Sequence, residues 1–142
     1  MIPNRESRAV FFFTNHMISQ FKYNSDGLIP AIVQDAKSKR VLMMAWMNDT
    51  SIRMTLEKGM MVYFSRSRQK YWVKGETSGN VQRVLRWAVD CDKDTLLFEV
   101  EQTGGACHTG YESCFFQELD NHGLPKPVEE TPLFDAAQTY GK

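Results

Sequence analysis

The stretch LIPAIVQDAKSKRVLMMAW, at residues 28–46, contains two apolar runs separated by a polar segment. The first run, residues 28–34, has a proline near its start and is typical of a strand. The second run, residues 41–46, is also typical of a strand, and the polar residues 35–40 between the two runs are suited to a turn. We therefore predict a β-hairpin at this position.

A short helix is predicted directly after the hairpin. Asn48, Asp49 and Thr50 are good N-cap residues, and Gly59 suits the position that follows a helix C-terminus. Between these ends, apolar side chains recur at helical spacing, at Ile52, Leu56 and Met60.

Further short strands are expected beyond the helix. Residues 61–65 and 71–74 flank a basic turn, residues 81–89 and 95–100 flank an acidic turn, and residues 114–119 form the last candidate strand. Short strands with one clear helix favour a β-rich α+β fold over a doubly wound parallel sheet.

The chain of 142 residues fits a single domain, which we expect to occupy residues 17–119. Several prolines and acidic residues after Asp120 predict an extended surface arm at residues 120–142. Residues 1–16 are expected to be a peripheral extension. Their apolar run, residues 9–13, is far shorter than the roughly 20 residues of a membrane span and lacks the cleavage site of a secretory signal.

Composition and charge exclude several classes of partner. Apolar residues make up 42% and charged residues 24% of the chain, and the formal net charge is +0. These values are ordinary for a soluble globular protein, and the chain has no overall field that would attract nucleic acid or an anionic membrane. We expect a cytoplasmic protein with neither partner.

Three cysteines, Cys91, Cys107 and Cys114, are candidate zinc ligands. They cannot all pair within one chain, and their polar surroundings make burial as small hydrophobes a poor explanation, which leaves a reactive thiol or metal ligands. A catalytic zinc usually keeps three protein ligands plus water, whereas a structural zinc has four. His108 could be the fourth ligand of a structural site, but it is adjacent to Cys107, so we favour an acid–base role for it.

Two further clusters are candidate ligand sites. Asp90, Asp92 and Asp94 alternate along the chain and could converge on Mg²⁺ in a tight turn, although an acidic turn without metal is the simpler alternative. Arg66 and Arg68 suit phosphate contacts, and the nearby Gly-rich loop at residues 75–79 can direct backbone N–H groups at an anion. The same basic cluster, with its aromatic residues, could instead be a solvated strand edge or an RNA-binding surface.

Together these segments resemble the phosphoribosyl-AMP cyclohydrolase family, the ring-opening enzymes of histidine biosynthesis. The resemblance runs roughly from residue 28 to residue 116. Its motifs are LIPAIVQD (28–35), MAWMN (44–48), SRSR (65–68), Trp72 with KGETSGN (74–80), DCDKD (90–94), ACHTG (106–110) and SCF (113–115).

The resemblance implies a homodimer with its sites at the subunit interface. Cys91 of one chain would share a zinc ion with Cys107 and Cys114 of the other, the three aspartates would bind Mg²⁺, and His108 would assist catalysis. The implied reaction is attack of zinc-activated water on C6 of the adenine ring of 1-(5-phosphoribosyl)-AMP, with cleavage of the N1–C6 bond. The implied substrate-binding residues are Arg66, Arg68, Trp72, Lys74, Glu76 and Ser78.

The sequence differs from members of this family in two ways that affect the predicted function. Relatives usually begin near Met17, so no role is transferred to earlier residues. Some relatives carry a fused phosphoribosyl-ATP pyrophosphohydrolase domain, and because this chain ends at Lys142 we expect the monofunctional form. The rival hypothesis is a zinc-stabilised RNA-binding module without turnover.

Overall fold

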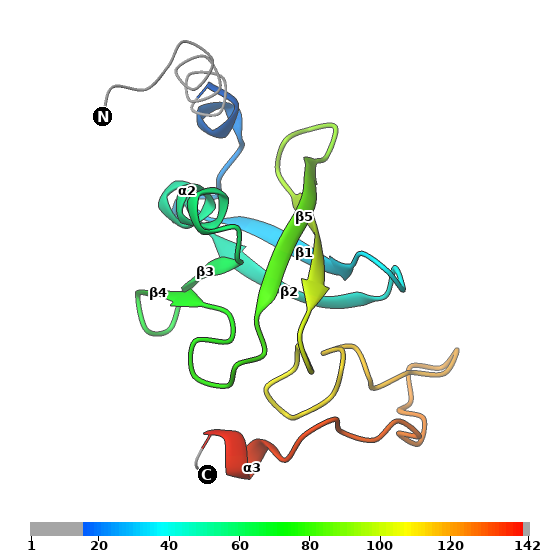
Figure 1. Ribbon diagram of the computed structural model, residues 1–142. Coiled ribbons are helices and arrows are strands. Elements are labelled where there is room, and N and C mark those ends of the chain that lie inside the picture. Colours follow the sequence, from blue (N-terminus) through cyan, green and yellow to red (C-terminus); the bar gives the residue numbers. More distant parts are fainter. Residues whose placement is uncertain (1–15, 141–142) are drawn as a thin grey trace.

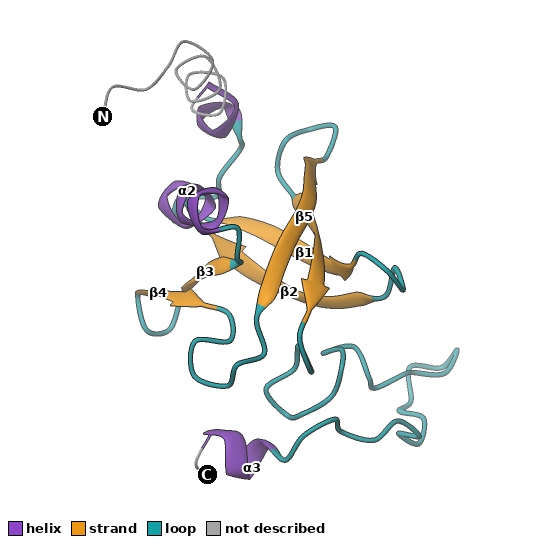
Figure 2. Cartoon of the chain, in the orientation of Figure 1, coloured by secondary structure: helices purple, strands orange, loops and turns teal. Residues whose placement is uncertain are grey.

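The computed structural model describes residues 16–140, which form two small sheets and short helices (Figure 1). The larger sheet has the strand order β2-β1-β6-β5 and the smaller one pairs β3 with β4 (Figure 2). The strands are β1 (Ile29–Asp35), β2 (Val41–Met47), β3 (Val62–Ser65), β4 (Lys70–Val73), β5 (Gln82–Val89) and β6 (Leu96–Gln102). The predicted β-rich α+β class is confirmed.

Three antiparallel pairs and one parallel pair connect the strands. The pairs β1–β2, β3–β4 and β5–β6 are antiparallel, as their short turns require, and β1 pairs with β6 in parallel. The predicted hairpin at residues 28–46 is therefore confirmed. The parallel β1–β6 pair joins the two halves of the domain into one sheet.

Helix α2 (Asp49–Lys58) begins and ends where the sequence predicts. The Asn48 side chain accepts a hydrogen bond from the Ser51 N–H at 2.8 Å, and the Ser51 hydroxyl accepts one from the Asn48 N–H at 2.9 Å. Gly59 ends the helix with a φ of 73°, a left-handed conformation that glycine adopts without steric cost.

The core lies between the larger sheet, α2 and β3. Ile29, Ala31 and Val33 on one face of β1 are fully buried, and so are Ile52 of α2 and Tyr63 of β3. Alternation along β1 buries one face of the strand, which fixes its register.

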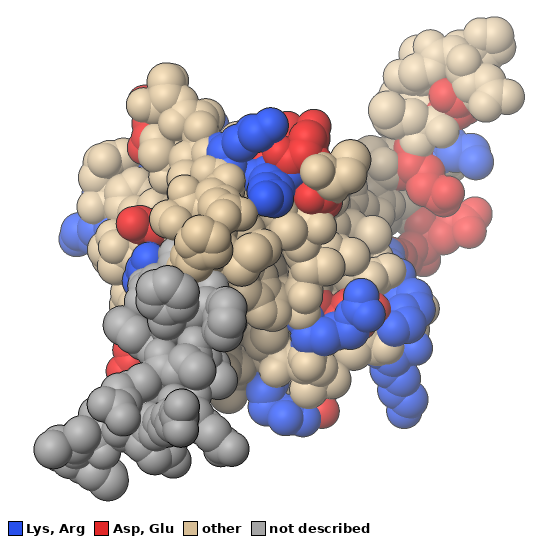
Figure 3. Space-filling view, turned by 90° about the horizontal axis from the view of Figure 1, so that it is seen from above, with Lys and Arg blue, Asp and Glu red and all other residues tan. Residues whose placement is uncertain are grey.

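Residues 16–20 form a helical turn just before the sheet, and Ile18 in this turn belongs to the core. The predicted extension at residues 1–16 lies outside the described residues except for His16. None of the helices within residues 16–140 is long and apolar enough to span a membrane. Basic and acidic side chains are interspersed on the face seen in Figure 3.

The predicted strand at residues 114–119 is wrong. Only the Cys114 N–H bonds the sheet, at Leu42 O, whereas the next N–H, that of Phe115, donates to the Ser113 hydroxyl at 2.9 Å. This local side-chain bond competes with strand pairing and turns the chain away from β2. Phe115 and Leu119 are 61% and 60% exposed.

The chain after residue 120 lies on the surface. Residues 126–134 have no helix or strand, and a short helix that the sequence did not predict, α3 (Ala136–Tyr140), follows them. In Figure 1 this orange and red segment passes beneath the yellow loop that follows β6.

Candidate active site

The loop at residues 104–114, which follows β6, carries two of the three cysteines and His108. Backbone bonds from Ala106 N–H to Glu112 O and from Cys107 N–H to Tyr111 O, at 2.9 and 3.1 Å, close the loop on itself. The Cys114 N–H then donates to Leu42 O at 2.7 Å, which ties the end of the loop to β2. This path brings Cys107 and Cys114 side by side.

Ionisation of this pair of thiols is unfavourable without a cation. Burial, together with the charge and hydrogen bond of the adjacent Cys107 thiol, raises the pKa of Cys114 to about 12. The Cys107 sulfur is buried and lies 2.8 Å from the Thr109 hydroxyl. A thiophilic dication would relieve the repulsion between two thiolates, so this donor pair fits zinc.

Lys74 lies directly beside these thiols. The Lys74 Nζ donates to Ala106 O at 2.6 Å and lies 5.6 Å from the centre of the Trp72 ring. Lys74 is only 5% exposed. Burial lowers the pKa of Lys74, and the neighbouring Cys114 and Cys107 thiols partly oppose this effect. The ammonium therefore contacts the cysteine loop, a position that the sequence motif did not reveal.

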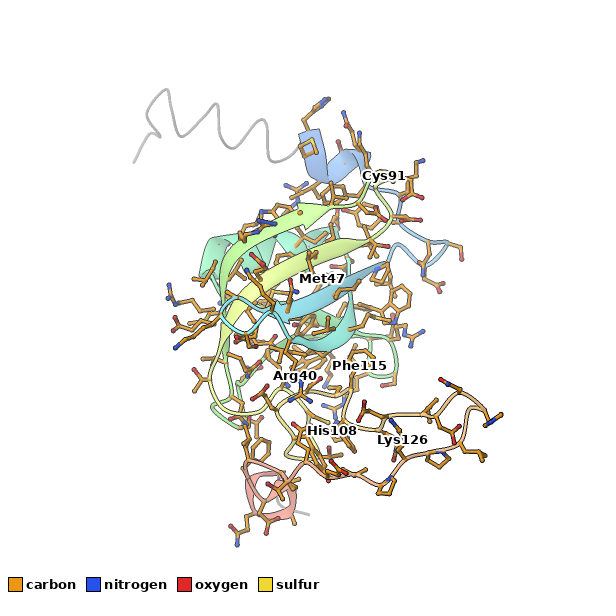
Figure 4. The ribbon with its side chains drawn as sticks, turned by 90° about the vertical axis from the view of Figure 1, so that its right-hand side faces the viewer. Arg40, Met47, Cys91, His108, Phe115 and Lys126 are labelled. Carbon is orange, nitrogen blue, oxygen red and sulfur yellow. The ribbon has the colours of Figure 1, made fainter. Side chains whose placement is uncertain are left out.

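Cys91 lies far from the other two cysteines. It is exposed in the β5–β6 turn, at the opposite end of the molecule from His108 (Figure 4). A site with all three cysteines therefore cannot form within one chain in this conformation.

The three aspartates converge in the same turn as Cys91. Asp90 Oδ1 accepts from the N–H groups of Asp94 and Thr95 at 3.0 and 3.2 Å, and this wraps the turn around the Asp90 carboxylate. One ligand atom from each of Asp90, Asp92 and Asp94 lies within 4.8 Å of the others. This is the convergence that the tight-turn interpretation requires.

The close spacing of these carboxylates shifts the pKa values of Asp90 and Asp94 in opposite directions. Hydrogen bonds and negative charge from Asp92 and Asp90 raise the pKa of Asp94. Partial desolvation opposes ionisation of Asp90, but hydrogen bonds from Asp94 and from the turn backbone hold the pKa of Asp90 below its usual range. All three side chains are exposed, so a cation could reach them from solvent.

Two adjoining cavities of about 700 and 820 Å³ lie between β2, the β3–β4 pair and the cysteine loop. Both are lined by Ser65, Ser67, Trp72, Lys74 and His108. We call the two cavities together the cleft. Cys114 and Arg66 line the first cavity only, and the second is completed by Arg68, Glu76 and Ser78. The structure thus gathers all six residues expected to bind substrate around His108.

Aromatic side chains shape the walls of the cleft. The Arg66 guanidinium lies 4.9 Å from the centre of the Trp46 ring, and the Trp72 ring lies 5.0 Å from that of Tyr63. The Tyr63 hydroxyl in turn donates to Gln82 Oε1 at 2.5 Å, which anchors the ring beneath Trp72. Trp46, which also lines the first cavity, belongs to the MAWMN motif, but no sequence signal assigned it to the site.

The sequence model of one family, described as phosphoribosyl-AMP cyclohydrolase, matches residues 43–116. The phosphoribosyl-AMP cyclohydrolase of Chlorobium chlorochromatii is 51% identical over 129 residues, which cover 91% of this chain and 93% of the relative. Those of Chlorobaculum tepidum and Chlorobaculum parvum are 50% and 53% identical over 142 residues, covering 100% of this chain and 98% of each relative.

The two Chlorobaculum alignments include residues 1–16, so this segment has counterparts in these relatives, and its peripheral role stays a prediction. The matched region contains the cysteine loop, the aspartate turn and most of the cleft. The resemblance inferred from the motifs is thereby confirmed: the chain belongs to the phosphoribosyl-AMP cyclohydrolase family.

Proposed function

We propose that this chain catalyses the cyclohydrolase step of histidine biosynthesis, the hydrolytic opening of the adenine ring of 1-(5-phosphoribosyl)-AMP. One observation carries the proposal. In a member of this family, Cys114, His108 and two arginines border one cleft, with Cys107 directly beside Cys114. The names of the relatives give the same activity for those proteins.

The cleft suits a flat base that carries phosphates. The substrate has a phosphorylated ribose on each side of the adenine ring, and Arg66 and Arg68 offer planar guanidinium groups for paired hydrogen bonds to phosphate. Trp72 offers an aromatic face to the base. Glu76 and Ser78 are suited to hydrogen bonds with ribose hydroxyls. Stacking on Trp46 restricts the orientation of Arg66 before substrate arrives.

Cys107 and Cys114 of one chain, with Cys91 of a second copy, would hold the zinc ion. A zinc ion bound there would lower the pKa of water, so that hydroxide for the attack on C6 would be available near neutral pH. The separation of Cys91 from the other cysteines supports a homodimer with shared sites. Lys74 partly compensates the negative charge of the thiolates.

His108 is assigned the proton transfers. When the N1–C6 bond breaks, C6 becomes a carboxamide and the nitrogen that leaves must gain a proton. His108 lines both cavities and is exposed to them, so its imidazole can reach a bound base from the side of the cysteine loop. Asp90, Asp92 and Asp94 are assigned to Mg²⁺, whose oxygen ligands match three converging carboxylates. We place the enzyme in the cytoplasm, without a nucleic-acid or membrane partner.

Ring opening, followed by absorbance on the purified protein with and without a chelator, tests the activity. We expect turnover that the chelator abolishes and added zinc restores. A zinc-stabilised RNA-binding module would show no turnover under any of these conditions, and that result would overturn the proposal.

The shared site has its own test in mixed dimers. Cys91→Ser and Cys107→Ser chains should each be inactive, and a mixture of the two should regain activity because one site of the mixed dimer has both intact halves. Verified mixed dimers without recovered activity would contradict a shared zinc site.

A further inference from the structure

The C-terminal segment at residues 128–140, which we call the arm, packs against the loop that carries Cys107 and His108. The Leu133 N–H donates to Gly110 O at 2.7 Å, a backbone bond between the arm and the far end of this loop. In Figure 1 the arm runs just below the lowest part of the yellow loop. The arm therefore contacts the backbone of the loop that carries the candidate catalytic residues.

Two glycines of the loop allow this close approach. A Cβ atom on Gly110 would lie 2.4 Å from Phe134 O and 3.0 Å from the Pro132 side chain, and the Gly110 φ of 101° also favours glycine. A Cβ atom on Gly105 would lie 3.0 Å from the Phe134 ring. Gly105 and Gly110 bracket Cys107 and His108, so the arm packs against the loop on both sides of these two residues.

A charged contact fixes the arm to the body of the domain. Arg40, which precedes β2, donates to both carboxylate oxygens of Glu130 at 2.7 and 2.8 Å, and its Nη1 also lies 3.2 Å from Glu112 of the loop. A paired guanidinium–carboxylate contact sets orientation as well as distance. Arg40 thus joins three segments: the hairpin, the cysteine loop and the arm.

The arm also reaches the cleft. Ala136 and Ala137 of α3 line the larger cavity together with Ser78, His108 and Thr109. Their small side chains leave room there, and the arm supplies a wall that the predicted domain at residues 17–119 lacks.

We propose that the arm is a positioning element of the active site, which holds the loop bearing Cys107 and His108 in its binding conformation and closes one side of the substrate cleft. This proposal rests on the proposed function for its substrate, but not for its effect on the loop. Groups that orient metal ligands from outside the coordination shell typically change metal affinity or activity by 10- to 100-fold. The arm packs on the loop at Gly105 and Gly110, which are two and three positions from Cys107, so we expect the lower end of that range.

Full-length point variants test the proposal. Glu130→Gln removes the paired contact with Arg40, and Phe134→Ala removes the ring that packs on Gly105. Glu129→Gln is the matched control, because Glu129 is exposed, adjacent, and undergoes the same loss of charge. Phe134→Leu tests rescue by a side chain that retains most of the bulk.

Three measurements separate positioning from plain stabilisation: zinc affinity by competition with a chelator, amide hydrogen exchange at residues 104–114, and kcat against KM for ring opening. In Glu130→Gln combined with Phe134→Ala we expect about tenfold weaker zinc binding, faster exchange confined to this loop, and a raised KM with lowered kcat. Glu129→Gln should match the wild type, and Phe134→Leu should recover most of the loss.

Zinc affinity and loop exchange within twofold of the wild type in the combined variant would overturn the proposal, even if the melting temperature fell. If the combined variant does not fold, the Glu130→Gln and Phe134→Ala single variants decide by the same criterion. A wild-type protein that opens no ring would refute the proposed function alone, because zinc affinity and exchange would still report on the arm.

Discussion

Replacing Lys74 with methionine should weaken zinc binding while leaving the metal-free fold nearly as stable. The change keeps a long apolar side chain but removes the ammonium that donates to Ala106 O at 2.6 Å. A hydrogen bond to a charged group contributes about 1.5–3 kcal/mol, which corresponds to roughly a 10- to 150-fold loss in zinc affinity if the bond is needed to orient the loop.

The metal-free protein should respond differently. Methionine leaves Ala106 O without its partner, but it also removes the cost of burying an ammonium beside Trp72. These two effects oppose each other: an unpaired buried carbonyl costs about 1–3 kcal/mol, and loss of the buried ammonium removes a desolvation penalty that offsets part of this cost. We therefore expect a change of only a few degrees in the melting temperature of the metal-free protein.

Zinc competition with a fluorescent chelator, on metal-free protein at one pH, measures this effect directly. Lys70→Met is the matched control, since Lys70 is exposed on the neighbouring strand β4 and its loss should leave zinc affinity unchanged. A Lys74→Met protein whose zinc affinity stays within threefold of the wild type would refute the reasoning.

Three other substitutions have definite expected outcomes. His108→Ala should lower turnover by about 10²- to 10⁴-fold and retain zinc, whereas loss of zinc in proportion to activity would show that His108 is a ligand. A hydrogen bond from Lys39 and the charge of Arg86 hold the pKa of Glu99 below its usual range. The ionised Glu99 side chain therefore stabilises the fold above about pH 4.3. The stability gap between wild type and Glu99→Gln in urea unfolding should therefore shrink as pH falls below that value, and a gap that widens in acid would contradict this sign. Thr55→Val removes the acceptor of the buried Val62 N–H, at 2.9 Å, and should cost about 1–3 kcal/mol in the same assay; a cost under about 0.5 kcal/mol would contradict it.

Local signals in the sequence were sufficient for most of the fold. The N-cap candidates Asn48, Asp49 and Thr50 predicted the start of α2 to within three residues, and Gly59 predicted its end, because capping depends on a residue and its neighbours within one turn. The hairpin at residues 28–46 followed from two apolar runs and the turn between them. The strand expected at residues 114–119 does not form. The Phe115 N–H, which a strand would pair with its neighbour, donates to the Ser113 hydroxyl instead.

The site was only partly predictable, because part of it depends on contacts between segments that are far apart in the chain. Cys107 and Cys114 are brought together by one short loop, which their spacing in the sequence already suggests. The burial of Lys74 and the contact of Arg40 with Glu130, which are 90 positions apart in the chain, depend on how distant segments pack. The apolar and charge patterns of the arm contain no signal for that contact.

Under the proposed function, the positions of the cysteines would link zinc binding to subunit association. In the antiparallel β5–β6 pair, the turn with Cys91 lies at one end of β6 and the loop with Cys107 follows its other end. The length of β6 therefore keeps the two halves of the proposed zinc site apart in each chain. Under the proposed function, only a second copy can bring Cys91 to the cleft. Zinc then binds the dimer and not the separate chains, so by mass action metal strengthens association and association strengthens metal binding.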